Sequence, residues 1–128
     1  MKRIKIFTLL SLIFLIAACS GNSNIYIDRV KKAIVSRNGD PFKKVIIDGA
    51  GTEVTYFIND KTKDNSAIYF NKHNPGFMVS EGFGLNKDYF LKLKPSTKYT
   101  VTAYAGDNQA QIVFRTDYNG DIKEPDDD

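Results

Sequence analysis

Residues 89–116 decide the fold and read YFLKLKPSTKYTVTAYAGDNQAQIVFRT. Hydrophobic and polar side chains alternate along them with a period of two, which is typical of strands that bury one face and expose the other. The separator Gly106-Asp107-Asn108 has turn chemistry and interrupts the pattern. We therefore expect three strands, whose inner faces carry three sets of residues: Tyr89, Leu91 and Leu93; Tyr99, Val101, Ala103 and Ala105; and Ala110, Ile112 and Phe114.

A family signature lies between the first two of these strands. Leu93-Lys-Pro95-Ser-Thr97-Lys-Tyr99 resembles the Leu-x-Pro-x-Thr-x-Tyr motif of fibronectin type III domains, and residues 114–116 are similar to their closing strand. The resemblance implies a β-sandwich in which Leu93, Pro95, Thr97 and Tyr99 form a tyrosine corner. In such a corner the buried tyrosine hydroxyl bonds backbone a few residues upstream.

The resemblance covers about a quarter of the chain, and the first half departs from the family pattern. Fibronectin type III domains usually carry a tryptophan on an early strand, whereas this chain has no tryptophan. Ile46, Ile47 and Tyr56 are the expected substitutes in the core. The integrin-binding Arg-Gly-Asp does not carry over, since residues 115–117 read Arg-Thr-Asp.

Shorter β-rich runs at residues 44–47, 53–58 and 67–70 precede this region. Sequences with turn chemistry, such as Asp48-Gly49-Ala50-Gly51 and Asn74-Pro75-Gly76, separate them. Many short strands at such spacing indicate an all-β domain. We expect one immunoglobulin-like or fibronectin type III-like β-sandwich of about seven strands over residues 25–117, with an unrelated small β-barrel as the alternative.

The start of this domain allows two interpretations. Asp28 could cap a short helix that runs to Val35, because Val30, Ala33 and Ile34 have helical spacing. The alternative is a first strand over residues 33–37, and we favour this strand.

Residues 72–85 combine many glycines with many apolar side chains and also allow two interpretations. Residues 77–80 form either a short edge strand, with Phe77 and Val79 in the core, or part of a binding loop. In the second case Phe77, Met78 and Phe83 belong to the loop, and Phe83 is an aromatic anchor between two glycines. Exposed aromatic and methionine side chains are enriched where proteins meet.

The N-terminus is typical of a secretory signal peptide, because a cationic start precedes an apolar run from Ile6 to Ile16. That run is shorter than the roughly 20 apolar residues of a membrane-spanning helix. Ile16-Ala17-Ala18-Cys19 resembles the lipobox of bacterial lipoproteins. The resemblance implies that residues 1–18 are removed and that Cys19 carries the lipid, diacylglycerol plus an acyl chain such as palmitate. Residues 19–24 would then tether the lipid to the fold.

The lipobox also predicts where the protein lies. Ser20 after the cysteine, rather than aspartate, agrees with outer-membrane sorting in enteric-type bacteria. We therefore expect a lipid-anchored protein of the cell envelope, in the outer membrane, on its periplasmic or surface face.

Charge excludes nucleic acid as a partner. The chain carries 18 basic and 15 acidic residues, and removal of residues 1–18 takes three basic ones, which leaves 15 of each sign. A neutral mature protein has no electrostatic footprint for a phosphate backbone. Much of the acidic charge lies in residues 118–128, which we expect to form a disordered tail.

We find no constellation of residues that predicts catalysis or metal binding. The single cysteine carries lipid in this interpretation, and His73, the single histidine, lies in a turn sequence. A zinc site needs several clustered ligands, and Asp48, Glu53, Glu81 and Asp88 are scattered among turns. We expect no enzyme activity, no cofactor and no metal.

The predicted function is therefore a small binding or assembly module held at a membrane by its lipid, with a protein as partner. One alternative is a carbohydrate- or peptidoglycan-binding module, in which Tyr69 and Tyr104 form an aromatic platform on solvent faces. The other is an accessory fragment of a hydrolase. The sequence does not identify the partner.

Overall fold

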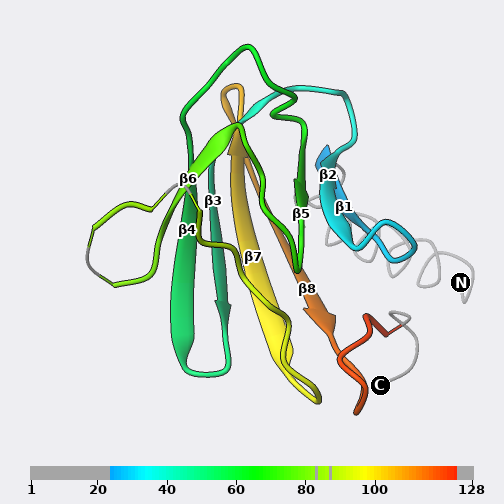
Figure 1. Cartoon of the computed structure of the whole chain (residues 1–128). Helices are drawn as coiled ribbons and strands as arrows, with labels where there is room; N and C mark the ends of the chain where they lie inside the picture. Colours follow the sequence, from blue (N-terminus) through cyan, green and yellow to red (C-terminus); the bar gives the residue numbers. More distant parts are fainter. Residues whose placement is uncertain (1–23, 83, 87, 124–128) are drawn as a thin grey trace, which may run out of the picture.

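The computed structural model describes residues 24–82, 84–86 and 88–123, and the regular elements of this part of the chain are all β-strands (Figure 1). Among these residues no helix is long and apolar enough to cross a membrane. The eight strands are β1 (Ile25–Asp28), β2 (Ala33–Ser36), β3 (Phe42–Gly49), β4 (Thr52–Ile58), β5 (Ala67–Tyr69), β6 (Phe77–Ser80), β7 (Lys98–Ala105) and β8 (Asn108–Arg115).

The strands form two antiparallel sheets that face each other as a β-sandwich (Figure 1). The smaller sheet has the order β1-β2-β5, and the larger has the order β6-β4-β3-β7-β8. The chain therefore changes sheet after β2, after β4 and again after β5. The all-β sandwich expected from the sequence is confirmed, with eight strands rather than about seven.

Buried and exposed side chains alternate along the strands, and the buried ones form a core between the two sheets. The burial of β7 follows the predicted parity, since Tyr99, Val101 and Ala103 are buried while Lys98 is exposed. The smaller sheet contributes inward side chains from each of its strands. The core residues with the lowest exposure come from both sheets: Ile25, Ile34, Ile68, Phe42, Val45, Ile47, Val54, Tyr56, Phe77, Tyr99 and Val101.

Two of the three proposed tryptophan substitutes lie in this core. Ile47 and Tyr56 are fully buried, but Ile46 is half-buried on the outer face of the larger sheet. The prediction for Ile46 is therefore wrong, because neighbouring residues on a strand point to opposite faces.

The first segment is a hairpin of β1 and β2, so the strand interpretation is confirmed and the helix is excluded. Asp28 does cap a turn, since its carboxylate accepts the N–H of Lys31 at 3.0 Å. That turn connects the two strands and leaves Val30 93% exposed. Val30 therefore does not share a face with Ala33 and Ile34, as a helix would require.

Residues 89–94 do not form the predicted strand, although their inner side chains Tyr89, Leu91 and Leu93 do pack against the core. The physical reason is that other groups take their backbone hydrogen bonds. The N–H of Leu91 bonds the Tyr56 hydroxyl at 3.0 Å, and the N–H of Lys94 bonds the Tyr99 hydroxyl at 2.8 Å. Asn71 binds between them, through its own N–H to the Leu91 carbonyl and through its side chain to the Leu93 N–H.

The chain turns back after β8 instead of entering a tail at residue 118. The N–H of Asp117 donates to the carbonyl of Asp121 at 2.8 Å, and the N–H of Lys123 donates to the carbonyl of Arg115 at 2.9 Å. These bonds bring Ile122 into the core at 5% exposure. The fold therefore extends to at least residue 123, because one apolar side chain anchors the returning segment.

Candidate binding surfaces

The predicted binding loop is an edge strand in its described part. Phe77 and Val79 fill the core from β6, and the Phe77 ring meets the Tyr56 ring edge-on with centroids 6.2 Å apart. The edge-strand interpretation, with Phe77 and Val79 in the core, is therefore confirmed, and the prediction that Phe77 belongs to a binding loop is wrong. Met78 points to the outer face and is half-buried. Phe83, the expected anchor, lies outside the described residues.

The structure does not bring the predicted tyrosine platform together. Tyr69 lies on β5 of the smaller sheet and Tyr104 on β7 of the larger sheet, and the strand neighbours of both point into the core. The two rings therefore lie on opposite outer faces of the sandwich. Each ring contacts a lysine ammonium, Lys72 at 4.3 Å from the Tyr69 centroid and Lys44 at 5.0 Å from that of Tyr104.

Met78 and Tyr104 do share a face, in a row that runs across four strands of the larger sheet. Met78 pairs with Phe57, Phe57 with Lys44, and Lys44 with Tyr104. Three strand spacings place Met78 and Tyr104 roughly 14 Å apart. The place of Phe57 in this row could not be predicted, because the alternation shows which face of its strand it lies on but not which residues of the neighbouring strands it pairs with. Lys44 separates the two aromatic side chains, so the row is not a continuous apolar platform.

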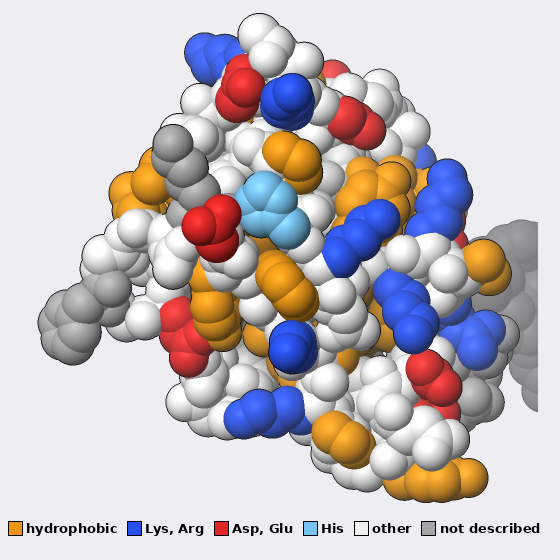
Figure 2. Space-filling view, in the orientation of Figure 1, with side chains coloured by type: hydrophobic (Ala, Val, Ile, Leu, Met, Phe, Trp, Pro, Cys, Tyr) orange, Lys and Arg blue, Asp and Glu red, His pale blue; other side chains and the backbone are white. Residues whose placement is uncertain are grey.

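His73 lies on the surface, where Figure 2 shows it among separate groups of basic, acidic and hydrophobic side chains. Residues 24–82, 84–86 and 88–123 contain no group of three or more His, Cys, Asp or Glu side chains that could hold a metal ion.

Burial raises the pKa values of two tyrosines, Tyr56 on β4 and Tyr89 after β6. Desolvation raises the pKa of Tyr56, and the Leu91 N–H opposes the rise. Desolvation, aided by a hydrogen bond from the phenol to the Glu81 carboxylate, raises the pKa of Tyr89 to about 12. Tyr89 and Glu81 line a hollow of about 460 Å³ beneath residues 88–94. Both phenols therefore stay protonated at neutral pH and act as hydrogen-bonding groups of the fold.

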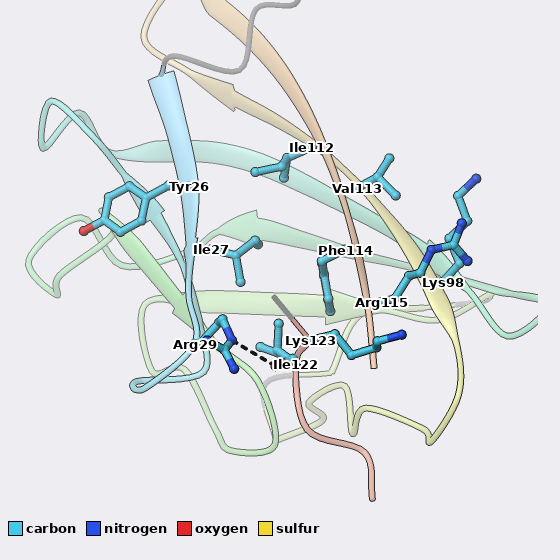
Figure 3. Close-up of a pocket in the computed structure, with 10 residues that line it drawn as sticks. All are labelled: Tyr26, Ile27, Arg29, Lys98, Ile112, Val113, Phe114, Arg115, Ile122 and Lys123. Carbon is cyan, nitrogen blue, oxygen red and sulfur yellow. Dashed lines mark hydrogen bonds between the residues drawn. The ribbon is translucent and has the colours of Figure 1, made fainter. Parts of the chain in front are cut away.

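A different groove lies where the two sheets end side by side (Figure 3). β1 is an edge strand of the smaller sheet, β8 is an edge strand of the larger one, and the two strands contact each other. The groove between them has a volume of about 350 Å³. Its walls come from β1, the start of β7, β8 and the returning segment: Tyr26, Ile27, Arg29, Lys98, Ile112, Val113, Phe114, Arg115, Ile122 and Lys123.

The groove combines an apolar floor with basic side chains. Ile27, Ile112 and Phe114 lie between the two strands, whereas Val113, which is 49% exposed, lies with Arg115 and Lys98 on the other side of β8 (Figure 3). Among the described lining residues the charged ones are Arg29, Lys98, Arg115 and Lys123, all of them cations. Apolar contact with charge of one sign suits a ligand that is partly apolar and acidic.

A bond from a side chain to the backbone lies at one end of this groove. The Arg29 guanidinium donates to the carbonyl of Ile122 at 3.1 Å and so ties the β1–β2 turn to the returning segment. The groove was missed at the sequence level, because its cations come from four segments between positions 29 and 123 that only the folded chain brings together.

In the predicted corner segment the structure shows one bond from the Lys94 N–H to the Tyr99 hydroxyl, at 2.8 Å. The groove between β1 and β8 is described by its lining residues. Comparison of the chain with family models, with curated proteins and with solved structures gives no match.

Proposed function

We propose that the protein is a lipid-anchored binding module of the cell envelope that holds an acidic segment of a protein partner in the groove between β1 and β8. The observation that carries the proposal is the composition of this groove, whose described lining residues combine apolar side chains with four cations. Two open strand edges beside it offer backbone donors and acceptors to an extended segment, as in recognition by strand addition.

The anchor is the second part of the proposal and rests on the lipobox at Cys19, which lies outside the described residues. Only six residues separate Cys19 from Tyr26 in the groove wall. Even a fully extended tether of this length reaches roughly 25 Å. A lipid on Cys19 would thus keep the groove close to the membrane, and its partner is a protein of the same membrane or of the adjoining envelope.

The carbohydrate alternative loses the observation that motivated it, since Tyr69 and Tyr104 lie on opposite outer faces. A protein segment also fits the groove better than an anionic lipid headgroup does, because a headgroup would use the cations but not Ile27, Ile112 and Phe114. Both ligands remain outcomes of the test below.

The test reverses charge in the groove of the full-length protein. Lys98→Glu/Arg115→Glu alters two lining cations, and Lys43→Glu/Lys61→Glu is the matched control with the same charge change at exposed sites outside the groove. Each variant is affinity-purified from detergent-solubilised native membranes at low and high salt. We expect the groove variant to lose a discrete co-purifying protein by at least about tenfold, as when charged contacts at an interface are reversed, while the control retains it.

Equal recovery by both variants at matched unfolding midpoints would contradict the proposal. Vesicles with anionic lipid and purified peptidoglycan serve as further probes. If the groove variant lost binding only to either of these, the partner class would be wrong.

A further inference from the structure

We infer that the outer face of the smaller sheet, together with the tip of the β1–β2 hairpin, lies against the anionic phospholipid surface of the membrane. The inference goes beyond the protein partner of the groove, and it rests on the proposed lipid anchor only for the presence of a membrane nearby. Anionic headgroups are the occupant because this face combines basic side chains with apolar and aromatic ones, which suit the edge of a bilayer.

The tip of the β1–β2 hairpin exposes an apolar side chain between two cations. Val30 is 93% exposed, more than any other large hydrophobic side chain of the described residues, and its neighbours are Arg29 and Lys31. The turn is fixed, since the Asp28 carboxylate accepts the Lys31 N–H at 3.0 Å. Such a tip fits the boundary between headgroups and acyl chains, where Val30 would leave water while the cations stay among the headgroups.

An apolar row crosses the outer face behind this tip. Tyr26 pairs with Val35 across β1 and β2, and Val35 pairs with Ala67 across β2 and β5. Figure 3 shows the Tyr26 ring pointing away from Ile27, which packs against the core. Tyr69 lies on the same outer face as Ala67, because the residue between them is buried. Two tyrosines thus flank small apolar side chains on one half-buried surface.

A basic side chain stands over each of these tyrosines. The Arg37 guanidinium lies 5.0 Å from the centroid of the Tyr26 ring, and the Lys72 ammonium lies 4.3 Å from that of Tyr69. Tyrosine has an apolar ring and a polar tip, and it is enriched at membrane interfaces together with basic residues. Both pairs therefore present to the headgroups the combination that this interface selects.

The positive charge of this face is local, since the mature chain would carry 15 residues of each sign. Residues 25–37 carry four basic residues and one acidic one, Asp28. Asp121 offsets one further charge, at 3.5 Å from Lys32. The basic side chains stay in excess with both aspartates counted. Figure 2 shows several of them beside hydrophobic side chains over the region of β1, β2 and β5. Each Lys or Arg near an anionic membrane strengthens binding about fivefold.

The chain enters the described fold at this sheet. β1 begins at Ile25, and Cys19 precedes it by six residues. Six extended residues span at most roughly 21 Å. A lipid on Cys19 would therefore confine the smaller sheet to the vicinity of the headgroups. At the resulting high effective concentration, a few weak contacts suffice to hold one face of the domain on the membrane.

Tryptophan fluorescence tests the inference, because the chain has no tryptophan of its own. Full-length protein is purified from native membranes and incorporated into vesicles of phosphatidylcholine and phosphatidylglycerol whose acyl chains carry bromine close to the headgroups. Val30→Trp should be quenched at least about threefold more strongly than Val113→Trp, on the outer face of the larger sheet. In vesicles of phosphatidylcholine alone, the quenching at position 30 should fall to the level of position 113.

Charge reversal tests the basic side chains separately from the tip. Lys31→Glu/Lys72→Glu in the Val30→Trp protein should lower the quenching at least about threefold in the anionic vesicles. The matched control Lys43→Glu/Lys61→Glu makes the same charge change at exposed sites of β3 and of the β4–β5 connection. It should leave the quenching unchanged, and an equal loss in both variants would contradict a specific basic face.

The protein without substitutions gives a readout that is free of the affinity of tryptophan for interfaces. Acylation by a soluble amine reagent should be at least about threefold slower at Lys31 and Lys72 in anionic vesicles than in detergent, with Lys61 unchanged. Flotation with the vesicles reports the anchor. Protein that floats, but is quenched equally at positions 30 and 113 or acylated equally in both media, would overturn this inference alone. Loss of flotation would contradict the anchor and the inference together, and neither result involves the partner of the groove.

Discussion

Tyr56 and Tyr99 lie on β4 and β7, two strands apart in the larger sheet, and their hydroxyls hold the same segment of chain. Tyr56 accepts the N–H of Leu91 at 3.0 Å, and Tyr99 accepts the N–H of Lys94 at 2.8 Å. These two bonds fix residues 91–94, which have no partner strand, over the core. The hydroxyls replace the ladder partner that a strand would have had.

The first prediction concerns Tyr99. Tyr99→Phe removes the acceptor of the Lys94 N–H, and we expect the free energy of unfolding to fall by about 1 to 3 kcal/mol, the cost of leaving a sequestered polar group unpaired. Tyr104→Phe is the control on the same strand. It should be nearly neutral, because Tyr104 is half-exposed and phenylalanine keeps the ring beside Lys44. Denaturant midpoints compare the two variants, and equal losses would contradict the corner role of Tyr99.

A second prediction concerns the contact of Gly49 with Tyr99. The two residues pair across β3 and β7, and a Cβ on Gly49 would clash with the Tyr99 ring and lie 2.9 Å from the Lys98 carbonyl. Gly49→Ala should therefore cost about 1 to 3 kcal/mol by overpacking. Ala50→Gly, at the next residue, should instead stabilise by about 0.5 kcal/mol, since Ala50 has a φ of 55°. Thermal unfolding of both variants checks the opposite signs, and a tolerated Gly49→Ala would rule out the close approach.

The third prediction is an alkaline loss of stability. A tyrosine in an unfolded chain ionises near pH 10, whereas the pKa of Tyr89 in the folded protein is raised to about 12. The folded state thus favours the protonated phenol, and this stabilisation is complete below about pH 10 and disappears as the pH rises to about 12. Tyr89→Phe should make the decline of the free energy of unfolding shallower in this window. Denaturant unfolding across the pH range measures it, and an unchanged slope would contradict the assignment.

Much of the fold could be predicted, because one-sided burial leaves a period of two in the sequence. This signal identified the inner residues of β7 and β8, and the turn sequence around Asp48 separated β3 from β4. It failed at residues 89–94, where the alternation predicted correctly which side chains face the core but the chain forms no strand. Alternation reports which side chains face the core, not which groups take the backbone hydrogen bonds. Those groups belong to Tyr56, Asn71 and Tyr99.

The candidate site was less predictable than the fold. Tyr69 and Tyr104 were each placed correctly on a solvent-facing side, but parity within a strand does not say to which sheet the strand belongs. Ile122 shows a related limit, since a single apolar residue in an acidic stretch carries no periodic signal and is buried only through tertiary contact. To predict the groove, one must know which sheet each strand belongs to and which isolated residues tertiary contacts bury. The sequence pattern gives neither.

The fourth prediction concerns the anchor. Cys19→Ala removes the only thiol that could carry the lipid, so the protein should remain an unprocessed precursor without lipid label. Intact-mass analysis of the wild-type protein should show a mature chain that begins at Cys19 and carries acyl groups, because stable anchoring takes two chains or more. A mature N-terminus at any other residue would contradict the lipobox interpretation.

The binding role of the groove is tested most directly by site-specific photo-crosslinking in native membranes. A photoreactive amino acid replaces Val113 in the groove wall, or Lys61 on the exposed β4–β5 connection as the control. The account predicts a discrete protein adduct from position 113 that is absent from position 61 and is lost when Lys98→Glu and Arg115→Glu are added. No adduct at position 113, or the same adduct at both positions, would contradict it.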